Sequence, residues 1–245
     1  MSPSEKTKFI SNWIKSYVDQ MPVKAQSLVI GISGGIDSSV SSTLSAMTGI
    51  KTIVLTMPIR QKDNQHDLSL KHQEWLIKNF KNVEAHTINL DKLFESFSST
   101  LEKFDNEHGY ANSRARLRMT TLYQVAAANK GIVVGTGNKV EDFGVGFYTK
   151  YGDGGVDISP IADCNKTEVW ELGKELGILK EIIDAPPTDG LWDDGRTDEG
   201  QLGFKYEDLE DAMKNPNSPH RQEYEKIRKQ NLHKMEPIPV CKIPR

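Results

Sequence analysis

A short stretch rich in glycine and serine carries the strongest chemical signal of the sequence. It reads Gly31-Ile32-Ser33-Gly34-Gly35-Ile36-Asp37-Ser38-Ser39. Gly34 and Gly35 lack a Cβ atom, so the backbone can turn sharply there and approach an anion closely. The stretch follows an apolar run and opens a predicted helix, whose first N–H groups and partial positive charge favour phosphate. Asp37 would repel phosphate unless a cation lay between them, which suggests Mg²⁺.

This stretch matches neither of two common nucleotide-binding fingerprints. The sequence contains no GxxxxGK[ST], which excludes a Walker A loop, and no GxGxxG, which argues against a Rossmann dinucleotide site. The alternative is a glycine turn in which Asp37 and the serines only cap a helix. A capping turn alone would not need Ser-Gly-Gly and Asp-Ser together, so we favour a nucleotide loop.

Continuous apolar runs rich in valine and isoleucine predict the strands that would position this loop. They lie at residues 27–32, 51–57, 83–88 and 131–136. Such runs are typical of parallel strands that are buried on both faces. Helical patterns lie at residues 5–20, 37–48, 66–80, 111–129, 206–213 and 218–231. The alternation of strand and helix predicts an α/β fold with a doubly wound sheet.

Ligands of such sheets bind beyond the carboxyl ends of the strands. Here those ends are Gly31–Gly35, Met57–Pro58 and Gly135–Asn138. Residues 144–157 are also dense in glycine and predict an ordered loop. Residues 185–203 are polar and rich in proline and glycine, and this connection is long enough to form a mobile lid.

Composition excludes several kinds of protein. The chain has 245 residues and a net charge of −3, from 31 Lys and Arg against 34 Asp and Glu, which disfavours nucleic acid as the main partner. No run approaches the ~20 apolar residues of a membrane-spanning helix, and the start lacks the apolar segment of a signal peptide. Cys164 and Cys241 match no zinc spacing and fit a reducing compartment. We therefore expect a cytoplasmic protein without a membrane partner, folded as one domain over residues 1–245.

The sequence SGGIDSS after a strand resembles the signature of the ATP-pyrophosphatase (PP-loop) superfamily. In that superfamily the loop grips the β,γ-pyrophosphate of ATP. Its members cleave ATP between the α- and β-phosphates and adenylate an oxygen of the substrate. The signature is specific for the superfamily and does not identify the substrate.

Three further stretches narrow the choice of family. They are Asn112–Met119 (NSRARLRM), Gly135–Asn138 (GTGN) with Glu141, and Lys150–Pro160 (KYGDGGVDISP). In this order and spacing they resemble the ammonia-dependent NAD synthetases, which convert deamido-NAD to NAD. The resemblance extends to Lys166-Thr167, Pro187-Thr188, Thr197-Asp198-Glu199, Leu202-Gly203 and His233-Lys234, and so covers residues from about 5 to 240.

The resemblance implies a fold and a nitrogen donor. The fold would be adenine-nucleotide α-hydrolase-like, with a mostly parallel five-stranded sheet flanked by helices. Glutamine-using relatives carry an additional amidase domain, and this chain has no room for one. Free ammonia is therefore the expected donor, with deamido-NAD and ATP as the other substrates.

The resemblance also implies roles for individual residues. ATP would contact Gly31, Ile32, Ser33, Gly34, Gly35, Ile36, Asp37, Ser38, Thr136, Lys166 and Thr188. Deamido-NAD would contact Arg116, Lys150, Asp157, His233 and Lys234. Asp37 and Glu141 would bind Mg²⁺, Lys166 would act in catalysis on the ATP phosphates, and Asp153 would accept a proton from ammonium. In this family a dimer partner commonly completes the site, so we expect a homodimer with a site shared across the interface.

Each of these residues also has an ordinary structural alternative. Arg116 could lie on a solvated helix face, and Lys150, Lys166 and the pair His233-Lys234 could be surface residues. Glu141 could cap a helix, and Asp153 could form a turn. Their joint order along one chain favours the functional interpretation. Ile36 stands where many relatives have glutamine, and residues 58–74 match the family only loosely.

Three other functions remain as alternatives. The first is a PP-loop enzyme that amidates xanthosine monophosphate, against which KYGDGG and the arginine-rich helix weigh. The second is a tRNA-thiolating enzyme, which would favour a basic surface and reactive cysteines. The third is a regulatory module that binds ATP without releasing pyrophosphate.

Overall fold

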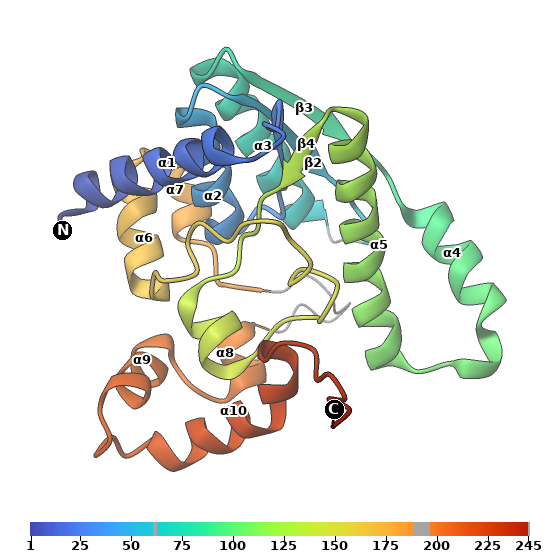
Figure 1. Ribbon diagram of the computed structural model, residues 1–245, viewed down its shortest axis with the longest axis vertical. Coiled ribbons are helices and arrows are strands. Elements are labelled where there is room, and N and C mark those ends of the chain that lie inside the picture. The colour runs from blue at the N-terminus through green and yellow to red at the C-terminus, as the bar shows by residue number, and fades with distance from the viewer. Residues whose placement is uncertain (61–62, 189–196, 245) are drawn as a thin grey trace.

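The computed structural model of the chain describes residues 1–60, 63–188 and 197–244. This part folds around one sheet of parallel strands in the order β3-β2-β1-β4. The strands are β1 (Ser27–Gly31), β2 (Lys51–Thr56), β3 (Val83–Thr87) and β4 (Gly131–Val133). All four begin at or within one residue of the predicted runs, which confirms the α/β fold (Figure 1).

The expected fifth strand is wrong for the described residues, which form four. A single parallel bridge, Val134 to Ile158, takes its place beyond β4. The Asp157 carboxylate accepts the Val133 N–H at 2.7 Å, so a side chain takes part in a position where strand backbone would pair. Pro160 follows two residues after Ile158 and has no N–H to donate, so the ladder does not extend.

The helices before the glycine-dense loop are α1 (Pro3–Gln20), α2 (Ile36–Met47), α3 (Asp63–Asn79), α4 (Asp91–Thr100), the short η1 (Glu102–Phe104) and α5 (Glu107–Ala128). Those around and after it are η2 (Lys139–Val145), α6 (Lys166–Glu175), α7 (Lys180–Ile183), α8 (Asp198–Leu202), α9 (Tyr206–Lys214) and α10 (Arg221–Met235). The sequence patterns predicted α1, α2, α3, α5, α9 and α10, but gave no range for α4, α6 and η2 or for the short η1, α7 and α8. Residues 189–196 of the expected lid lie outside the described residues. Among those described, no helix is long and apolar enough to cross a membrane.

Alternate side chains of the strands enter two apolar layers. Leu28 and Ile30 of β1 join the layer that α1, α2, α3 and α6 cover, whereas Val29 joins the layer under α4 and α5. Figure 1 shows α5 on one side of the sheet and α1, α2 and α6 on the other. Burial on both faces explains why the strands read as continuous apolar runs.

Helix α2 is buried although it is rich in serine. Ser39, Ser42 and Ser45 are all below 1 % exposed. Their hydroxyls donate to backbone carbonyls of the preceding turn, as Ser39 Oγ does to Gly35 O at 2.9 Å. Small side chains allow neighbours to come close: a Cβ at Gly173 of α6 would lie 2.6 Å from Ile36 Cδ1. This packing holds α6 against the first turns of α2.

A third apolar cluster joins α9 and α10 to η2. It contains Val140, Val145, Tyr206, Leu209, Ala212 and Tyr224. In Figure 1 these helices lie below the sheet, next to the glycine-dense loop. The cluster therefore connects the C-terminal helices to the segments that follow β4.

Candidate active site

The nucleotide loop turns between the end of β1 and the start of α2. Gly34 has φ +89°, a conformation that side chains rarely adopt, so a glycine is required there. Gly35 is the N-cap of α2 and has no side chain with which to bond the first N–H groups. Ser38 Oγ instead accepts from Ser33 N at 3.2 Å and donates to Gly35 O at 3.1 Å, which fixes the loop. The helix terminus is thus open to an anion, as the sequence predicts.

Lys166 lies between two carboxylates at the centre of the site. Its Nζ is 2.6 Å from Asp37 Oδ2 and 2.8 Å from Glu141 Oε1. The residue is 1 % exposed. Burial alone would lower the pKa of Lys166, but the two carboxylates outweigh it and the pKa is raised, so the ammonium keeps its charge. Three chain segments that are far apart in sequence therefore meet in one ionic cluster.

Asn138 links Asp37 to the segment that carries Glu141. Its Nδ2 donates to Asp37 Oδ1 at 3.0 Å. Its Oδ1 accepts from the N–H groups of Val140 and Glu141, each at 3.0 Å, which caps η2. This element is a π-helix, a form often found at functional sites. The side chain is fully buried, so its amide links the nucleotide loop to the segment after β4.

Tyr206 closes the cluster from the side of α9. Its hydroxyl is 2.5 Å from Glu141 Oε1 and 3.4 Å from Asp198 Oδ2. Burial, and then the charges of Glu141 and Asp198, raise the pKa of Tyr206 far above its usual value, so the hydroxyl stays protonated. Its ring packs edge-on against Trp170, with centroids 5.8 Å apart.

A small cavity of about 90 Å³ lies between η2 and the glycine-dense loop. Asp142 and Asp153 line it, together with Tyr148 and Ser159. Burial, reinforced by the charges of Asp153, Glu141 and Asp37, raises the pKa of Asp142 well above its usual value. A Cβ at Gly137 would lie 1.9 Å from Asp142 Oδ2, so the close approach of this carboxyl requires glycine.

The chain itself brings α10 to the glycine-dense loop. Lys150 Nζ donates to the carbonyl of His233 at 3.0 Å. Lys234 Nζ donates to the carbonyl of Tyr148 at 2.9 Å, and Tyr148 Oη returns a bond to Lys234 O at 2.5 Å. Arg116 Nε reaches Lys150 O at 3.3 Å. Four of the five residues predicted to contact deamido-NAD thus lie together, and burial lowers the pKa of Lys234.

The remaining predicted residues lie around this centre in different settings. Asp157, the fifth predicted deamido-NAD contact, bonds Val133 N and accepts from Tyr123 Oη at 3.1 Å, so its carboxylate is engaged at the sheet edge. Thr136 is half-buried just beyond β4. Thr188 is half-buried and immediately precedes the segment outside the described residues.

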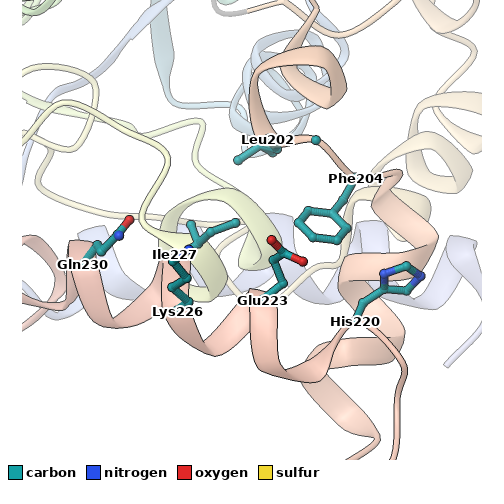
Figure 2. A pocket seen from close by; sticks show the side chains of 8 residues that line it. Leu202, Phe204, His220, Glu223, Lys226, Ile227 and Gln230 are labelled. Carbon is teal, nitrogen blue, oxygen red and sulfur yellow. The ribbon is translucent and has the colours of Figure 1, made fainter.

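A larger hollow of about 490 Å³ lies away from these residues, on α8 and α10. Figure 2 shows Phe204, His220 and Ile227 around it. None of the predicted site residues lines this hollow. The predicted site residues therefore gather around the ends of β1 and β4 and the glycine-dense loop, and not at the larger hollow.

Comparison with known proteins fits this arrangement. Residues 6–243 match the family described as NAD synthase. The chain belongs to the NAD synthase family. The NH(3)-dependent NAD(+) synthetase of Carboxydothermus hydrogenoformans is 38 % identical over 212 residues, which cover 84 % of this chain and 83 % of that protein.

Two solved structures show the same fold over almost the whole chain. The NMN synthetase from Francisella tularensis has a TM-score of 0.91 and 32 % identity, and the alignment covers 99 % of this chain and 100 % of that one. The NH3-dependent NAD synthetase from Campylobacter jejuni has a TM-score of 0.79 at 23 % identity, with the same coverage. At 23 % identity, the second likeness supports only the fold of this chain and not its function.

Asp37 and Glu141 are the residues that would hold the predicted Mg²⁺. Among the described residues, no three His, Cys, Asp or Glu side chains gather as a ready-made metal site. Mg²⁺ usually needs only one or two carboxylates together with substrate phosphates. Asp37 and Glu141 already converge on one cation, the Lys166 ammonium, beside the phosphate-binding loop.

Three residues of the candidate site were not predicted from the sequence. Asn138 belongs to the GTGN stretch, and an asparagine directly before the helical segment that begins at Lys139 is a capping signal. Asp142 directly follows Glu141, and a second carboxyl at that place was a usable signal. Tyr206 gave no such signal, because it reaches Glu141 only through the packing of α9.

Proposed function

We propose that this protein amidates deamido-NAD to NAD with free ammonia, consuming ATP and releasing AMP and pyrophosphate. The observation that carries the proposal is the buried Lys166, which joins Asp37 of the nucleotide loop to Glu141. This cluster places a fixed cation and two carboxylates beside open helix N–H groups. Such groups stabilise charge on ATP phosphates and on the leaving pyrophosphate.

The first step activates the nicotinate carboxylate, because oxide is not a usable leaving group. A carboxylate oxygen attacks the α-phosphorus of ATP, the bond from that phosphorus to the bridging oxygen breaks, and pyrophosphate leaves. The loop amides and Lys166 hold the phosphates during this displacement. Asp37 and Glu141 would bind Mg²⁺, which supplies further neutralisation of phosphate charge.

The second step forms the amide. Ammonia attacks the carbonyl carbon of the mixed anhydride, the bond to the AMP oxygen breaks and AMP leaves, and the attacking nitrogen loses one proton to solvent to give the neutral amide. Ammonia is mostly ammonium at neutral pH, so a base must first take one proton. Asp153 is the proposed base: its Oδ1 accepts from Thr149 N at 2.9 Å, and the carboxyl lines the small cavity near Glu141.

The substrate would lie along the cationic side of the site. Arg116, Lys150, His233 and Lys234 surround the glycine-dense loop and suit a diphosphate and a carboxylate. Their proximity within one chain supports this location. Asp157 would contribute from the sheet edge, with one carboxylate oxygen shared with Tyr123.

The proposal includes a homodimer in the cytoplasm. Leu93 and Phe104 are 49 % and 78 % exposed and offer apolar surface for a second copy. Both cysteines are free, as expected in a reducing compartment. Light scattering of the purified protein tests the dimer by its mass.

A second candidate substrate is nicotinate mononucleotide, with NMN as product. It is favoured by the likeness to the Francisella NMN synthetase, which has a TM-score of 0.91 and is covered over its full length. The same two steps would apply, because both substrates carry the same nicotinate carboxylate. Xanthosine monophosphate and tRNA lose support, as does a regulatory role, because the chain belongs to the NAD synthase family.

The test is pyrophosphate release from ATP and Mg²⁺ with each substrate in turn. Ammonium and glutamine are supplied separately as nitrogen donors. Release that requires deamido-NAD, with NAD formed only from ammonium, supports the proposal. A kcat/KM that is higher for nicotinate mononucleotide assigns the second candidate, and no release with either acid refutes both.

A further inference from the structure

Tyr206 reaches the ionic cluster from outside the nucleotide-binding half. It is the first residue of α9, 65 positions after Glu141. Its hydroxyl is 2.5 Å from Glu141 Oε1, the same oxygen that accepts from Lys166 Nζ at 2.8 Å. Glu141 is therefore gripped at one oxygen by two donors from different parts of the chain.

Contacts of the ring and of the backbone N–H hold Tyr206 in place. The ring is fully buried and meets Trp170 at an interplanar angle of 86°. The Lys166 ammonium lies 5.0 Å from the ring centroid. The backbone N–H of Tyr206 donates to Glu199 Oε1 at 3.1 Å. The phenol is thus a rigid donor and not a side chain that happens to lie nearby.

The phenol has one proton to donate and two carboxylates within reach. Glu141 at 2.5 Å is nearer than Asp198 at 3.4 Å, so the hydroxyl donates to Glu141. A glutamate has three rotatable side-chain bonds, and holding it in one rotamer costs conformational entropy. A donor fixed by the surrounding packing holds Glu141 in place before ATP arrives.

We propose that Tyr206 is a positioning residue for the adenylation step: it fixes Glu141, and through it Lys166, in the arrangement that receives Mg²⁺ and the ATP phosphates. The inference rests on the proposed function for its kinetic readout. Without the hydroxyl, Glu141 turns more freely, and Lys166 is drawn toward Asp37 and the nucleotide loop. The ring and its packing against Trp170 do not depend on the hydroxyl.

Tyr206→Phe tests this role because it removes the oxygen and keeps the ring. We expect kcat for pyrophosphate release to fall about ten- to a hundredfold, the loss associated with one hydrogen bond to a charged group. The half-saturating Mg²⁺ concentration should rise several-fold. ATP affinity, measured by calorimetry, should weaken both with and without Mg²⁺. The KM for deamido-NAD should stay within twofold.

Two further variants separate positioning from general packing. Tyr224→Phe is the matched control, since Tyr224 is buried in the same apolar cluster and packs against Arg221; it should leave kcat, the Mg²⁺ requirement and ATP affinity unchanged. In a Glu141→Ala background, Tyr206→Phe should cause no further change in ATP affinity, because the acceptor through which the hydroxyl acts on Lys166 is already gone, even though Asp198 remains within reach.

Several outcomes overturn the inference. They are unchanged ATP affinity and Mg²⁺ requirement in Tyr206→Phe, a full additional loss in the Glu141→Ala background, or the same kinetic loss in Tyr224→Phe. A wild-type protein that binds ATP but forms no amide would refute the proposed function instead. The ATP affinities of the wild type and of Tyr206→Phe, compared by calorimetry, would then still decide the role of the hydroxyl.

Discussion

The nucleotide side and the substrate side of the site use opposite ways to hold a lysine. Lys166 is 1 % exposed and bonds two carboxylates, whose own positions depend on Asn138 and Tyr206. Lys150 is exposed to a greater degree and bonds a single backbone carbonyl, that of His233. The first lysine belongs to a closed ionic network, and the second rests on the surface of α10.

This difference suggests how the two sides divide the work. Charges that must be ready for the ATP phosphates are ordered in advance, so little reorganisation is needed during the reaction. An ammonium has three N–H groups, and Lys150 commits one of them to His233. It can turn toward a substrate anion at the cost of one neutral hydrogen bond. We therefore expect removal of Lys166 to affect folding and chemistry, and removal of Lys150 to affect substrate binding.

Lys166→Ala should have the largest effect. It leaves Asp37 and Glu141 facing each other without a cation, which should cost about 3–5 kcal/mol of unfolding free energy. Pyrophosphate release should fall about a thousandfold or more. Urea unfolding and a pyrophosphate assay measure the two effects. A variant with normal stability would show that the cluster is not a closed network.

Acid should weaken the nucleotide side through His72 of α3. This histidine is 0 % exposed, and its Nε2 lies 3.0 Å from Ser42 Oγ of α2. Burial lowers its pKa from the usual 6.5 to about 4. Below pH 6.5 the unfolded chain binds the proton first, so stability falls as the pH drops from 6.5 to about 4, by about 3 kcal/mol in total.

The measurement for His72 is unfolding free energy between pH 7.5 and pH 4. His72→Gln removes the titrating ring and should flatten this part of the curve relative to the wild type. His86→Gln, which replaces an exposed histidine that pairs with Glu84, provides the control. A wild-type curve with the same slope as the His72→Gln curve would contradict the prediction.

Lys150→Ala should act on one substrate only. We expect the KM for deamido-NAD to rise about ten- to thirtyfold, the loss of one charge-assisted bond, while the KM for ATP changes by less than twofold. Thermal unfolding should be almost unchanged. Equal increases in both KM values would contradict the proposed division of work between the nucleotide side and the substrate side.

Asp163→Ala should have the smallest effect and sharpens the contrast with Lys166. Lys139 pairs with Asp163 at 2.7 Å, but the Asp163 side chain is 96 % exposed. Exposed ion pairs contribute little, so the melting temperature should stay within about 1 °C and both KM values should be unchanged. A clear loss of activity would show that the Lys139–Asp163 pair contributes to the active site.

The sequence was sufficient for the features that local patterns determine. The strands could be found because burial on both faces leaves uninterrupted apolar runs, and the nucleotide loop because its glycines and Asp37 lie within seven residues of one another. Strand ends beyond Val133 were less predictable. There the Asp157 side chain bonds the Val133 N–H, and no local pattern reveals a partner 24 positions away.

Other site residues depend on tertiary packing. The meeting of Asp37 and Glu141 follows from the pairing of β1 with β4, because each residue comes shortly after the carboxyl end of one of these parallel strands. Tyr206 could not be found in this way, because it lies on α9, and only the tertiary packing of that helix brings it to Glu141. The contact of His233 with Lys150 within one chain was equally hidden, and family resemblance alone pointed to a partner subunit there.

Helix α1 has a consequence for how the chain is made. Its buried side chains Ile14 and Val18 pack in the same layer as Val169 and Leu172 of α6, and Lys6 pairs with Glu168, 162 positions later. A ribosome adding roughly 5–20 residues per second needs about 8–30 s to cover that interval. During this time α1 can pack against α2 but not yet against α6, so part of its apolar face stays uncovered while the chain is being made.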